Sequence, residues 1–343
     1  MKHQNTISGK VLNWVLMAGL ALVPALTARA IERTGGTPAS VVDFNGDGKT
    51  DFAVVRNTGG GPNGQITWYV QNNGGPFQAA EWGLTTDTFV PADYDGDGRT
   101  DYAVWRSGAP TAAAFYVLNS QGNTIRIESF GQTGDDPTVV GDYDGDGRAD
   151  LAVYRNGQSS GEQSYWFYRG SLNNPNGSVT YVPWGKAGDF PAPGDYDGDG
   201  KHDFVVQSND DIQFIWARFW LLQTTAGIRS LRFGNVTDRI APGDYDGDGK
   251  TDLCIVKNSS GRYRFWIQDS STGALRVVDF GLSATDFITP GDYDGDGKTD
   301  LAIWRPSTTA GQSAFWVAGS LIGPLKFNFG QNADYPAANF NVH

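Results

Sequence analysis

The sequence predicts an all-β protein, a β-propeller built from four-stranded blades. Three observations predict it: an acidic nine-residue loop recurs six times, short apolar and aromatic segments surround each loop in a fixed order, and a Phe-Gly or Trp-Gly pair ends each repeat. We expect six full blades, with seven blades, the last incomplete, as the alternative.

The recurring loop has the form DxDGDGxxD. Five copies begin at Asp93, Asp142, Asp195, Asp244 and Asp292, and a variant copy, DFNGDGKTD, begins at Asp43. Successive copies are 50, 49, 53, 49 and 48 residues apart, and a truncated seventh copy begins at Asn339. A period of this length indicates that one supersecondary unit recurs along the chain.

Each repeat contains four segments with the length and composition of strands. A lead-in such as Val90-Pro91-Ala92 runs into the loop, and an apolar run such as residues 300–305 follows it. An aromatic segment such as Trp166-Phe167-Tyr168 comes next, and a pair such as Phe130-Gly131 ends the repeat.

The segment after the loop is apolar at nearly every position, so both of its faces must be covered. A propeller blade, which packs on two neighbours, meets this requirement. A linear β-solenoid and a β-sandwich are the alternatives, but a sandwich would not repeat so regularly.

The chain is expected to have two parts. Residues 1–30 have the features of a signal peptide: Lys2 and Lys10 precede an uncharged apolar stretch, and Ala28-Arg29-Ala30 is an A-x-A type cleavage site. An uncleaved membrane anchor is the alternative reading. Residues 31–343 are expected to form a single propeller domain of six repeats, near 49 residues each, plus a C-terminal closing strand. That strand, around Tyr335, either closes the ring or starts a seventh blade.

These motifs resemble the FG-GAP/VCBS-type calcium-loop repeats that also build the propeller head of the integrin α-subunit. The resemblance rests on the acidic loop between a proline-containing strand and an apolar strand, and on the Phe-Gly pair that closes each unit. It covers essentially the whole chain after the signal. It implies a propeller fold, but the integrin head has seven blades where six full repeats are present here.

The amino-acid composition limits where the protein can act and which classes of partner it can bind. The chain has one cysteine, Cys254, so no intramolecular disulfide can form, and no later segment is long and apolar enough to span a bilayer. Removal of the signal leaves 23 basic and 38 acidic residues, a net charge of −15. This acidity argues against nucleic acid as a partner. We therefore expect an exported protein that is secreted, periplasmic or attached to the cell surface.

Each loop has the ligand chemistry of a calcium site, because carboxylates at alternate positions of a short loop can wrap one ion. We expect up to six Ca²⁺ ions, and we expect the first loop to bind most weakly because Asn45 replaces an aspartate there. The expected side-chain ligands are Asp43, Asn45, Asp47 and Asp51; Asp93, Asp95, Asp97 and Asp101; Asp142, Asp144, Asp146 and Asp150; Asp195, Asp197, Asp199 and Asp203; Asp244, Asp246, Asp248 and Asp252; and Asp292, Asp294, Asp296 and Asp300.

The acidic loops have two alternative interpretations. An EF-hand places its bidentate glutamate at position 12 and continues into a helix, whereas here position 9 is aspartate and a strand follows. A solvated acidic turn without metal is the second alternative. Mutual repulsion among four carboxylates would raise their pKa values there.

The sequence shows no catalytic set. His202 stands at the loop position that Thr50, Thr100 and Thr251 hold in other loops, and no nucleophile–base or zinc pattern surrounds it. Paired carboxylates for glycoside chemistry stay open, because further aspartates recur once per repeat just before the lead-in. We expect them to have a turn role; they are Asp87, Asp136, Asp189, Asp238, Asp286 and Asp334.

A second repeated feature concerns binding. The strand after the loop ends in a basic residue in five repeats and in Ser208 in the remaining one. Arg106, Arg155 and Arg305 follow an aromatic residue directly, and an arginine beside a ring can hold a carbohydrate or an acidic group. A structural role, in stacking or in ion pairs, is the alternative for this column of residues.

Together these features predict an exported, calcium-binding propeller that acts as a non-catalytic binding or adhesion module. Its ligand would be a protein or a carbohydrate at or outside the cell surface. The alternative is a polysaccharide-active lyase or hydrolase on the same scaffold, and a structural part of a larger surface assembly is the third candidate.

Overall fold

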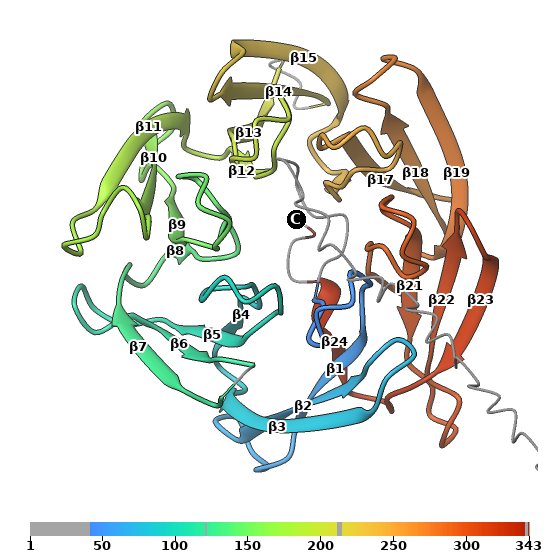
Figure 1. Ribbon diagram of the computed structural model, residues 1–343. Helices are drawn as coiled ribbons and strands as arrows, with labels where there is room; N and C mark the ends of the chain where they lie inside the picture. The colour runs from blue at the N-terminus through green and yellow to red at the C-terminus, as the bar shows by residue number, and fades with distance from the viewer. Residues whose placement is uncertain (1–41, 121, 211–214, 340–341, 343) are drawn as a thin grey trace, which may run out of the picture. The chain divides into compact units, whose positions relative to one another are not determined.

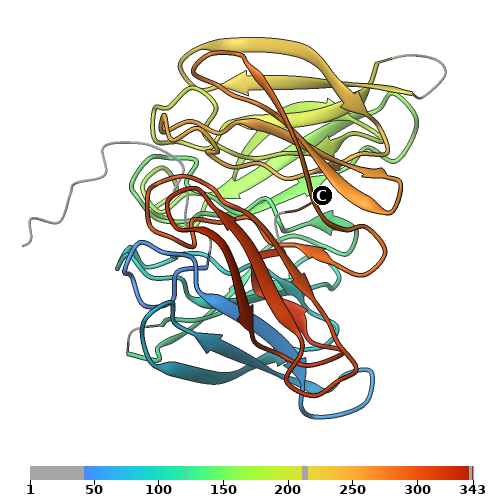
Figure 2. The ribbon, with the colours of Figure 1, turned by 90° about the vertical axis from the view of Figure 1, so that its right-hand side faces the viewer.

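The computed structural model describes residues 42–120, 122–210, 215–339 and 342. The expected signal peptide lies outside the described residues. Those residues form six antiparallel sheets of four strands each, and no α-helix occurs among them. The sheets are arranged as blades around a common axis, as Figure 1 shows face-on and Figure 2 from the side.

In blades two to six, the four strands follow one another along the chain, from the innermost to the outermost (Figure 1). Their bounds are: blade two, β4 (Thr88–Phe89), β5 (Tyr102–Arg106), β6 (Ala114–Leu118) and β7 (Ile125–Ser129); blade three, β8 (Asp135–Asp136), β9 (Leu151–Arg155), β10 (Gln163–Arg169) and β11 (Thr180–Lys186); blade four, β12 (Phe190–Pro191), β13 (Phe204–Asn209), β14 (Trp216–Gln223) and β15 (Gly227–Asn235); blade five, β16 (Arg239–Ile240), β17 (Leu253–Ser259), β18 (Arg262–Gln268) and β19 (Leu275–Leu282); and blade six, β20 (Phe287–Ile288), β21 (Leu301–Arg305), β22 (Ala314–Gly319) and β23 (Gly323–Asn328).

Blade one combines strands from both ends of the described chain. It consists of β1 (Phe52–Asn57), β2 (Gln65–Gln71), β3 (Phe77–Leu84) and β24 (Tyr335–Pro336), in the order β24-β1-β2-β3. Within it, β24 pairs antiparallel with β1, and a 3₁₀ turn, η1 (Ala337–Asn339), follows. The fold is therefore the expected all-β propeller with six blades, and the seven-blade alternative is not needed.

The hydrophobic core is divided among the interfaces between blades. Along β5, Val104 packs in one cluster with Trp68 and Ile66 of blade one, whereas Trp105 packs in the next cluster with Val153 of blade three. Both faces of the strand after the loop are thus buried, which explains why its sequence is apolar without alternation. Cys254 is completely buried in the corresponding cluster of blade five and serves as a small core residue.

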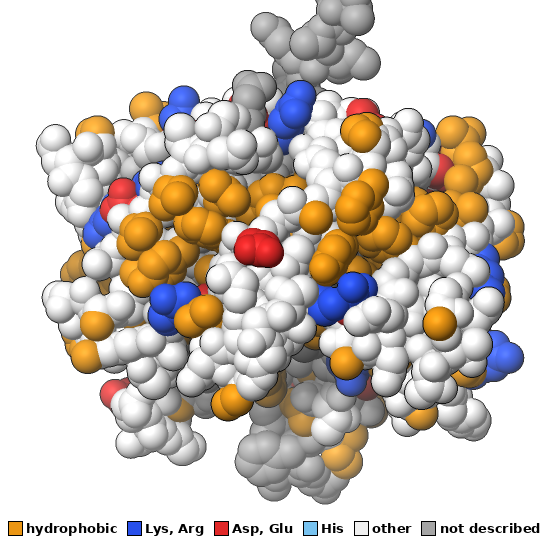
Figure 3. Space-filling view, turned by 90° about the horizontal axis from the view of Figure 1, so that it is seen from below, with side chains coloured by type: hydrophobic (Ala, Val, Ile, Leu, Met, Phe, Trp, Pro, Cys, Tyr) orange, Lys and Arg blue, Asp and Glu red, His pale blue; other side chains and the backbone are white. Residues whose placement is uncertain are grey.

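The outermost strands are only partly covered. Ile125 and Ile127 of β7 are 61% and 58% exposed, and similar side chains recur on β15 and β19. On the side of the molecule seen in Figure 3, hydrophobic side chains gather in two patches that a polar strip separates. In the described part of the chain, there is no helix with the length and apolar character needed to cross a membrane.

Candidate functional site

In blades two to six, the acidic loop joins the innermost strand to the next strand, and in blade one it directly precedes β1. In blade two, the loop starts at Asp93 after β4 and ends at Asp101, which forms a bridge with Ala92. Asp93 folds the loop around its carboxylate: its Oδ1 accepts a hydrogen bond from the Gly96 amide at 2.7 Å and its Oδ2 from the Gly98 amide at 2.8 Å. Both glycines have φ near +80°, which only glycine adopts without strain.

The same pair of hydrogen bonds forms in the other five loops. There, too, the amides of the two loop glycines donate to the two oxygens of the first aspartate, which is Asp43, Asp142, Asp195, Asp244 or Asp292. In four loops the Oδ1 atom also accepts a hydrogen bond from the amide of the residue at loop position 5, at 3.2 Å. The first aspartate therefore holds its loop in shape through hydrogen bonds from the loop's own main chain.

The closing aspartate ties each loop to the outer half of its own blade. Asp101 Oδ2 accepts from the Tyr94 amide at 3.0 Å, and its Oδ1 accepts from the Ser120 amide at 2.8 Å. Ser120 lies in the turn between β6 and β7. The equivalent turn donors in the other blades are Asn73, Ser171, Thr224, Ser270 and Ser320.

These turn residues were not predicted as part of the site, although the sequence held a signal for them. Each one is a serine, threonine or asparagine that follows the aromatic segment of its repeat by a constant interval. The third loop position contacts the same turn, because Asp197 Oδ2 accepts hydrogen bonds from the Thr225 amide at 2.9 Å and the Thr225 hydroxyl at 2.7 Å.

Burial of the loop carboxylates opposes their ionisation. The closing aspartates are at most 2% exposed, and burial, reinforced by neighbouring loop carboxylates, raises the pKa of each to about 7; they are Asp51, Asp101, Asp150, Asp203, Asp252 and Asp300. Burial also raises the pKa of every first aspartate. A bound divalent cation would remove this penalty by neutralising the charge.

Four loops contain a buried carboxylate oxygen with no hydrogen-bond partner. These atoms are Asp97 Oδ2, Asp144 Oδ1, Asp197 Oδ1 and Asp294 Oδ1. Buried acceptors are almost always satisfied, so these four oxygens point to a group that the protein alone does not supply. A hard cation with oxygen ligands, such as Ca²⁺, fits them.

The predicted ligands also converge within single loops. Carboxylate oxygens of Asp93, Asp95 and Asp101 lie within 4.8 Å of one another. The same holds for three further triplets: Asp142, Asp144 and Asp146; Asp195, Asp197 and Asp199; and Asp244, Asp246 and Asp248. In the first loop, Asn45 Oδ1 accepts from the Asp47 amide at 2.8 Å, so the amide side chain keeps the loop shape with one charge fewer.

One further acidic residue, which was not predicted, lies close to the loop carboxylates. Asp269 lies just before the turn donor Ser270, and its carboxylate is grouped with those of Asp246 and Asp252. It also forms a 2.8 Å ion pair with Arg276. Its lone position in the repeat pattern explains why the sequence did not single it out.

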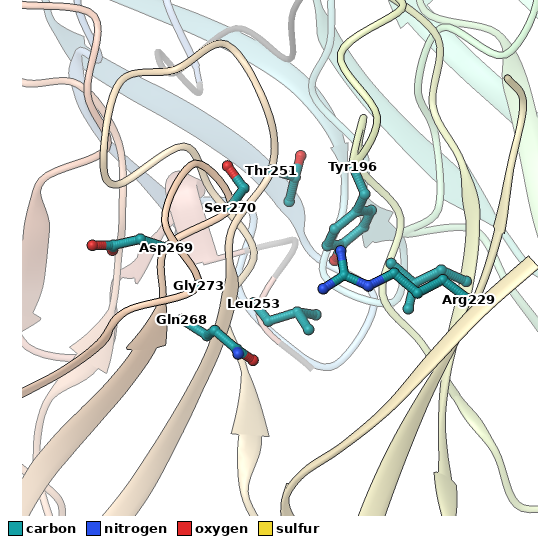
Figure 4. A pocket seen from close by; sticks show the side chains of 9 residues that line it. Tyr196, Arg229, Thr251, Leu253, Gln268, Asp269, Ser270 and Gly273 are labelled. Atoms are coloured by element: carbon teal, nitrogen blue, oxygen red, sulfur yellow. The ribbon is translucent and has the colours of Figure 1, made fainter. Parts of the chain in front are cut away.

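Asp269 and Ser270 line a small pocket between blades four and five (Figure 4). Tyr196 and Arg229 lie side by side on the blade-four side of this pocket, and Leu253 forms part of its base. Its volume of about 40 Å³ holds a few water molecules and is far below that of a site for an organic ligand.

Hydrogen bonds between main chains connect the six loops into a closed ring. The residue at loop position 8 donates its amide to the carbonyl oxygen of the first aspartate in the preceding loop, at 2.6–2.7 Å. The donor and acceptor pairs are Thr100 and Asp43, Ala149 and Asp93, His202 and Asp142, Thr251 and Asp195, Thr299 and Asp244, and Thr50 and Asp292. Each candidate metal loop is therefore also part of the contact between two blades.

The basic residues at the ends of the strands that follow the loops, here called the basic column, form ion pairs. Arg106 Nε and Nη2 each donate to Asp87 at 2.8 Å, and the guanidinium lies 4.5 Å from the Tyr116 ring centre. Arg155 pairs in the same way with Asp135 and stacks on Phe167, and Arg305 pairs with Asp286 and stacks on Trp316. About a third of each arginine side chain is exposed.

The aspartates that recur before the lead-in have the expected turn role. Asp87 Oδ2, for example, accepts a hydrogen bond from the Leu84 amide at 2.8 Å. In blade three, Asp135 takes this position, so the prediction of Asp136 there is wrong. The correction is one residue, because Asp135 pairs with Arg155 and Asp136 accepts instead from Thr138.

Arg155 also lines a larger recess. This recess has a volume of about 440 Å³ and lies between blades two and three, where Phe130, Phe167 and Val179 contribute to its wall. The volume is within the range of small-molecule sites. His202, by contrast, packs against Tyr143 at the loop ring, and burial lowers its pKa to about 4, so it stays neutral at pH 7.

Comparison with known proteins agrees with the repeat pattern. A family model described as an FG-GAP-like repeat matches residues 43–104, 93–153, 142–206, 195–255 and 244–303. Among solved structures, the exotype rhamnogalacturonan lyase YesX aligns with 84% of this chain and 69% of its own, at 11% identity and a TM-score of 0.32. No curated protein matches the chain significantly. Because the repeat model spans well over half of the sequence, the chain belongs to the FG-GAP-like repeat family.

Proposed function

We propose that this FG-GAP-repeat propeller is an exported calcium-binding protein that acts as a non-catalytic binding or adhesion module. Its ligand is a protein or a glycan at or outside the cell surface. The observation that carries the calcium part is the set of four buried carboxylate oxygens without hydrogen-bond partners, one in each of four loops.

Calcium has a structural role in this proposal. The aspartates at loop positions 1, 3, 5 and 9 and the main-chain carbonyl at position 7 would hold the ion. The same aspartates bind the outer turn of their blade, and the first one accepts the inter-blade hydrogen bond. An ion in the loop therefore stabilises both one blade and its contact with the next.

Three of the aspartates that could have acted as catalytic acids are held by arginines, and this favours binding over catalysis. Asp87, Asp135 and Asp286 each accept two hydrogen bonds from an arginine, which leaves them poorly suited to proton transfer. The recess beside Arg155, with its aromatic wall, suits a ligand that stacks on a ring. Export follows from the expected signal peptide and agrees with a single, buried cysteine.

A calorimetric calcium titration combined with a glycan array tests the proposal. The purified protein should bind several Ca²⁺ ions, and it should retain specific glycans or surface proteins more strongly with calcium than with chelator. Arg155→Ala, which alters the recess, should be compared with Arg264→Ala, which alters an exposed ion pair elsewhere. Release of unsaturated or reducing ends from a polysaccharide panel would identify an enzyme instead.

A further inference from the structure

Blade four lacks the basic residue that every other blade places between an aspartate and an aromatic ring. The residue concerned lies two positions after a Val or Ile that faces the ring on the next strand. It is Arg56, Arg106, Arg155, Lys257 or Arg305 in five blades, and Ser208 in blade four, at the top of Figure 1.

Blade two shows what this residue does. The Arg106 guanidinium pairs with Asp87 on one side and lies over Tyr116 on the other. Register places the same groups in blade four, because Val206 faces Trp220 as Val104 faces Tyr116. Blade four thus has the aspartate and the ring, but Ser208 takes the place of the basic residue between them.

Asp189, the aspartate equivalent to Asp87, keeps its turn role without a basic partner. Its Oδ2 accepts from the Lys186 amide at 2.9 Å, and the residue is 4% exposed. Among the described residues, no arginine or lysine forms an ion pair with it. Burial raises the pKa of Asp189, although hydrogen bonds from Ser208 and the Lys186 amide, and the charge of Lys186 beyond ion-pair distance, oppose this effect. Blade four therefore holds a buried carboxylate without the charge partner that its counterparts have.

A second polar group, the Tyr154 hydroxyl, borders the Asp189 carboxylate. It is buried and makes no hydrogen bond of good geometry, although nearby Ser164 opposes the rise that burial causes in its pKa. A Cβ built on Gly185 would lie 2.6 Å from this hydroxyl oxygen and 3.4 Å from Asp189 Oδ2, so both groups border the same glycine. Together they offer two acceptors to an N–H donor from outside.

Trp220, the aromatic ring of blade four at this position, is exposed to solvent. It is 39% exposed, more than the equivalent ring in any other blade, and Trp216 on the same face of β14 is 46% exposed. Arg218 does not replace the missing cation. Its guanidinium lies 5.9 Å from a Trp220 ring centre and is held by Asp210, farther from the ring than the column residues, which lie at 4.4–5.5 Å.

We propose that blade four binds an arginine or lysine side chain of a partner protein, between the Asp189 carboxylate and the Trp220 ring. The partner's cation takes the position that each other blade fills with its own residue. The proposal rests on the binding function inferred above and names the class of partner. An acidic chain of net charge −12 favours a basic ligand, and a ring plus a desolvated carboxylate favours a guanidinium.

Titration of the purified protein with short peptides tests this directly. The probes are acetyl-Gly-Gly-Arg-Gly-Gly-amide, its lysine analogue and its neutral citrulline analogue, followed by tryptophan fluorescence and by calorimetry. A basic peptide should bind saturably, and the citrulline peptide should bind at least tenfold more weakly. Ser208→Arg, which supplies the missing cation, should abolish binding and leave the unfolding temperature unchanged or raised.

Two further variants keep the test decisive. Asp189→Asn should weaken binding at least tenfold while the protein stays folded. Ser159→Arg, which adds the same charge on an exposed turn of blade three, should leave binding unchanged.

Undetectable binding, or binding that survives both Ser208→Arg and Asp189→Asn, would overturn the proposal. So would loss of glycan binding in Trp220→Ala without any peptide binding, because a sugar would then occupy this blade. Calcium binding and array binding do not depend on these results, so failure here is distinguishable from failure of the proposed function.

Discussion

Arg56 donates two hydrogen bonds, at 2.7 and 2.8 Å, to Asp334, which lies 278 residues farther along the chain. The same segment supplies β24, whose residues Tyr335 and Pro336 pair with Val55 and Val54 of β1. Blade one is thus completed by an ion pair and a strand from the far end of the propeller. This joint closes the ring, because every other blade draws its strands from one continuous stretch.

Loss of this ion pair should weaken the whole ring. The Asp334 side chain is completely buried, so Arg56→Ala leaves a desolvated carboxylate without its partner and should cost about 1–3 kcal/mol. Thermal unfolding should show a midpoint lower by several degrees, whereas Arg264→Ala, in an ion pair exposed on both sides, should change it little. Equal effects of the two variants would mean that the Arg56 pair has no special role in closure.

Close packing between neighbouring loops gives a second prediction. A Cβ built on Gly141 would lie 2.4 Å from the His202 ring, so Gly141→Ala should destabilise the protein by about 1–3 kcal/mol. At the contact between blades two and three, Ala92 corresponds to Gly141 and Ala149 corresponds to His202. A small residue at loop position 8 therefore makes room for alanine in place of the glycine.

The double variant Gly141→Ala/His202→Ala should therefore recover most of the lost stability in chemical denaturation. A double variant no more stable than Gly141→Ala alone would contradict the packing explanation.

An added negative charge in the first loop should lower the unfolding temperature in chelator and raise it in calcium. Asn45→Asp adds a carboxylate next to Asp47, so the variant should unfold at a lower temperature than the parent in chelator. In calcium the added ligand should reverse this order and remove the weakest site from a calorimetric titration. A shift of the same sign in both conditions would show that Asn45 does not border a calcium site.

The stabilising effect of calcium should grow with pH. Without metal, the closing aspartates have a folded-state pKa of about 7, above the ordinary value near 4, so their contribution favours the folded state at low pH. That contribution is lost as the pH rises through about 7. Calcium binds the deprotonated form, so its effect on the unfolding temperature should be larger at pH 8 than at pH 5.5. An effect that does not change over this range would argue against these carboxylates as ligands.

The fold was largely predictable from the sequence because each repeat contains its own blade. The unbroken apolar run of β5, for example, required cover on both faces, and only a ring of blades supplies it for every repeat. The six blades were expected and are confirmed, but the sequence left open how the ring closes. The answer is the pairing of Tyr335 with Val55, two residues too far apart in the sequence for a local pattern to decide.

The candidate site was predictable in part for the same reason. The loop aspartates stand at fixed spacing, but their partners Ser120 and Ser171 lie in turns of the outer strands, and only the tertiary structure brings them to the carboxylates. The basic column was visible as a pattern. Its ion pairs, such as that of Arg106 with Asp87, and the consequence of its interruption at Ser208 became clear only from the tertiary structure and the strand register.

Thermal unfolding with calcium and with chelator tests the central claim most directly. If dissociation constants are about 10⁻⁴–10⁻³ M, 1 mM calcium stabilises each site by about 0.4–1.4 kcal/mol. With up to six sites around the ring, the midpoint should rise by several degrees in calcium and fall again in excess chelator, and magnesium at the same concentration should have a smaller effect. An unfolding midpoint that is the same in calcium and in chelator would contradict the account, because the acidic loops would then be turns held by hydrogen bonds alone.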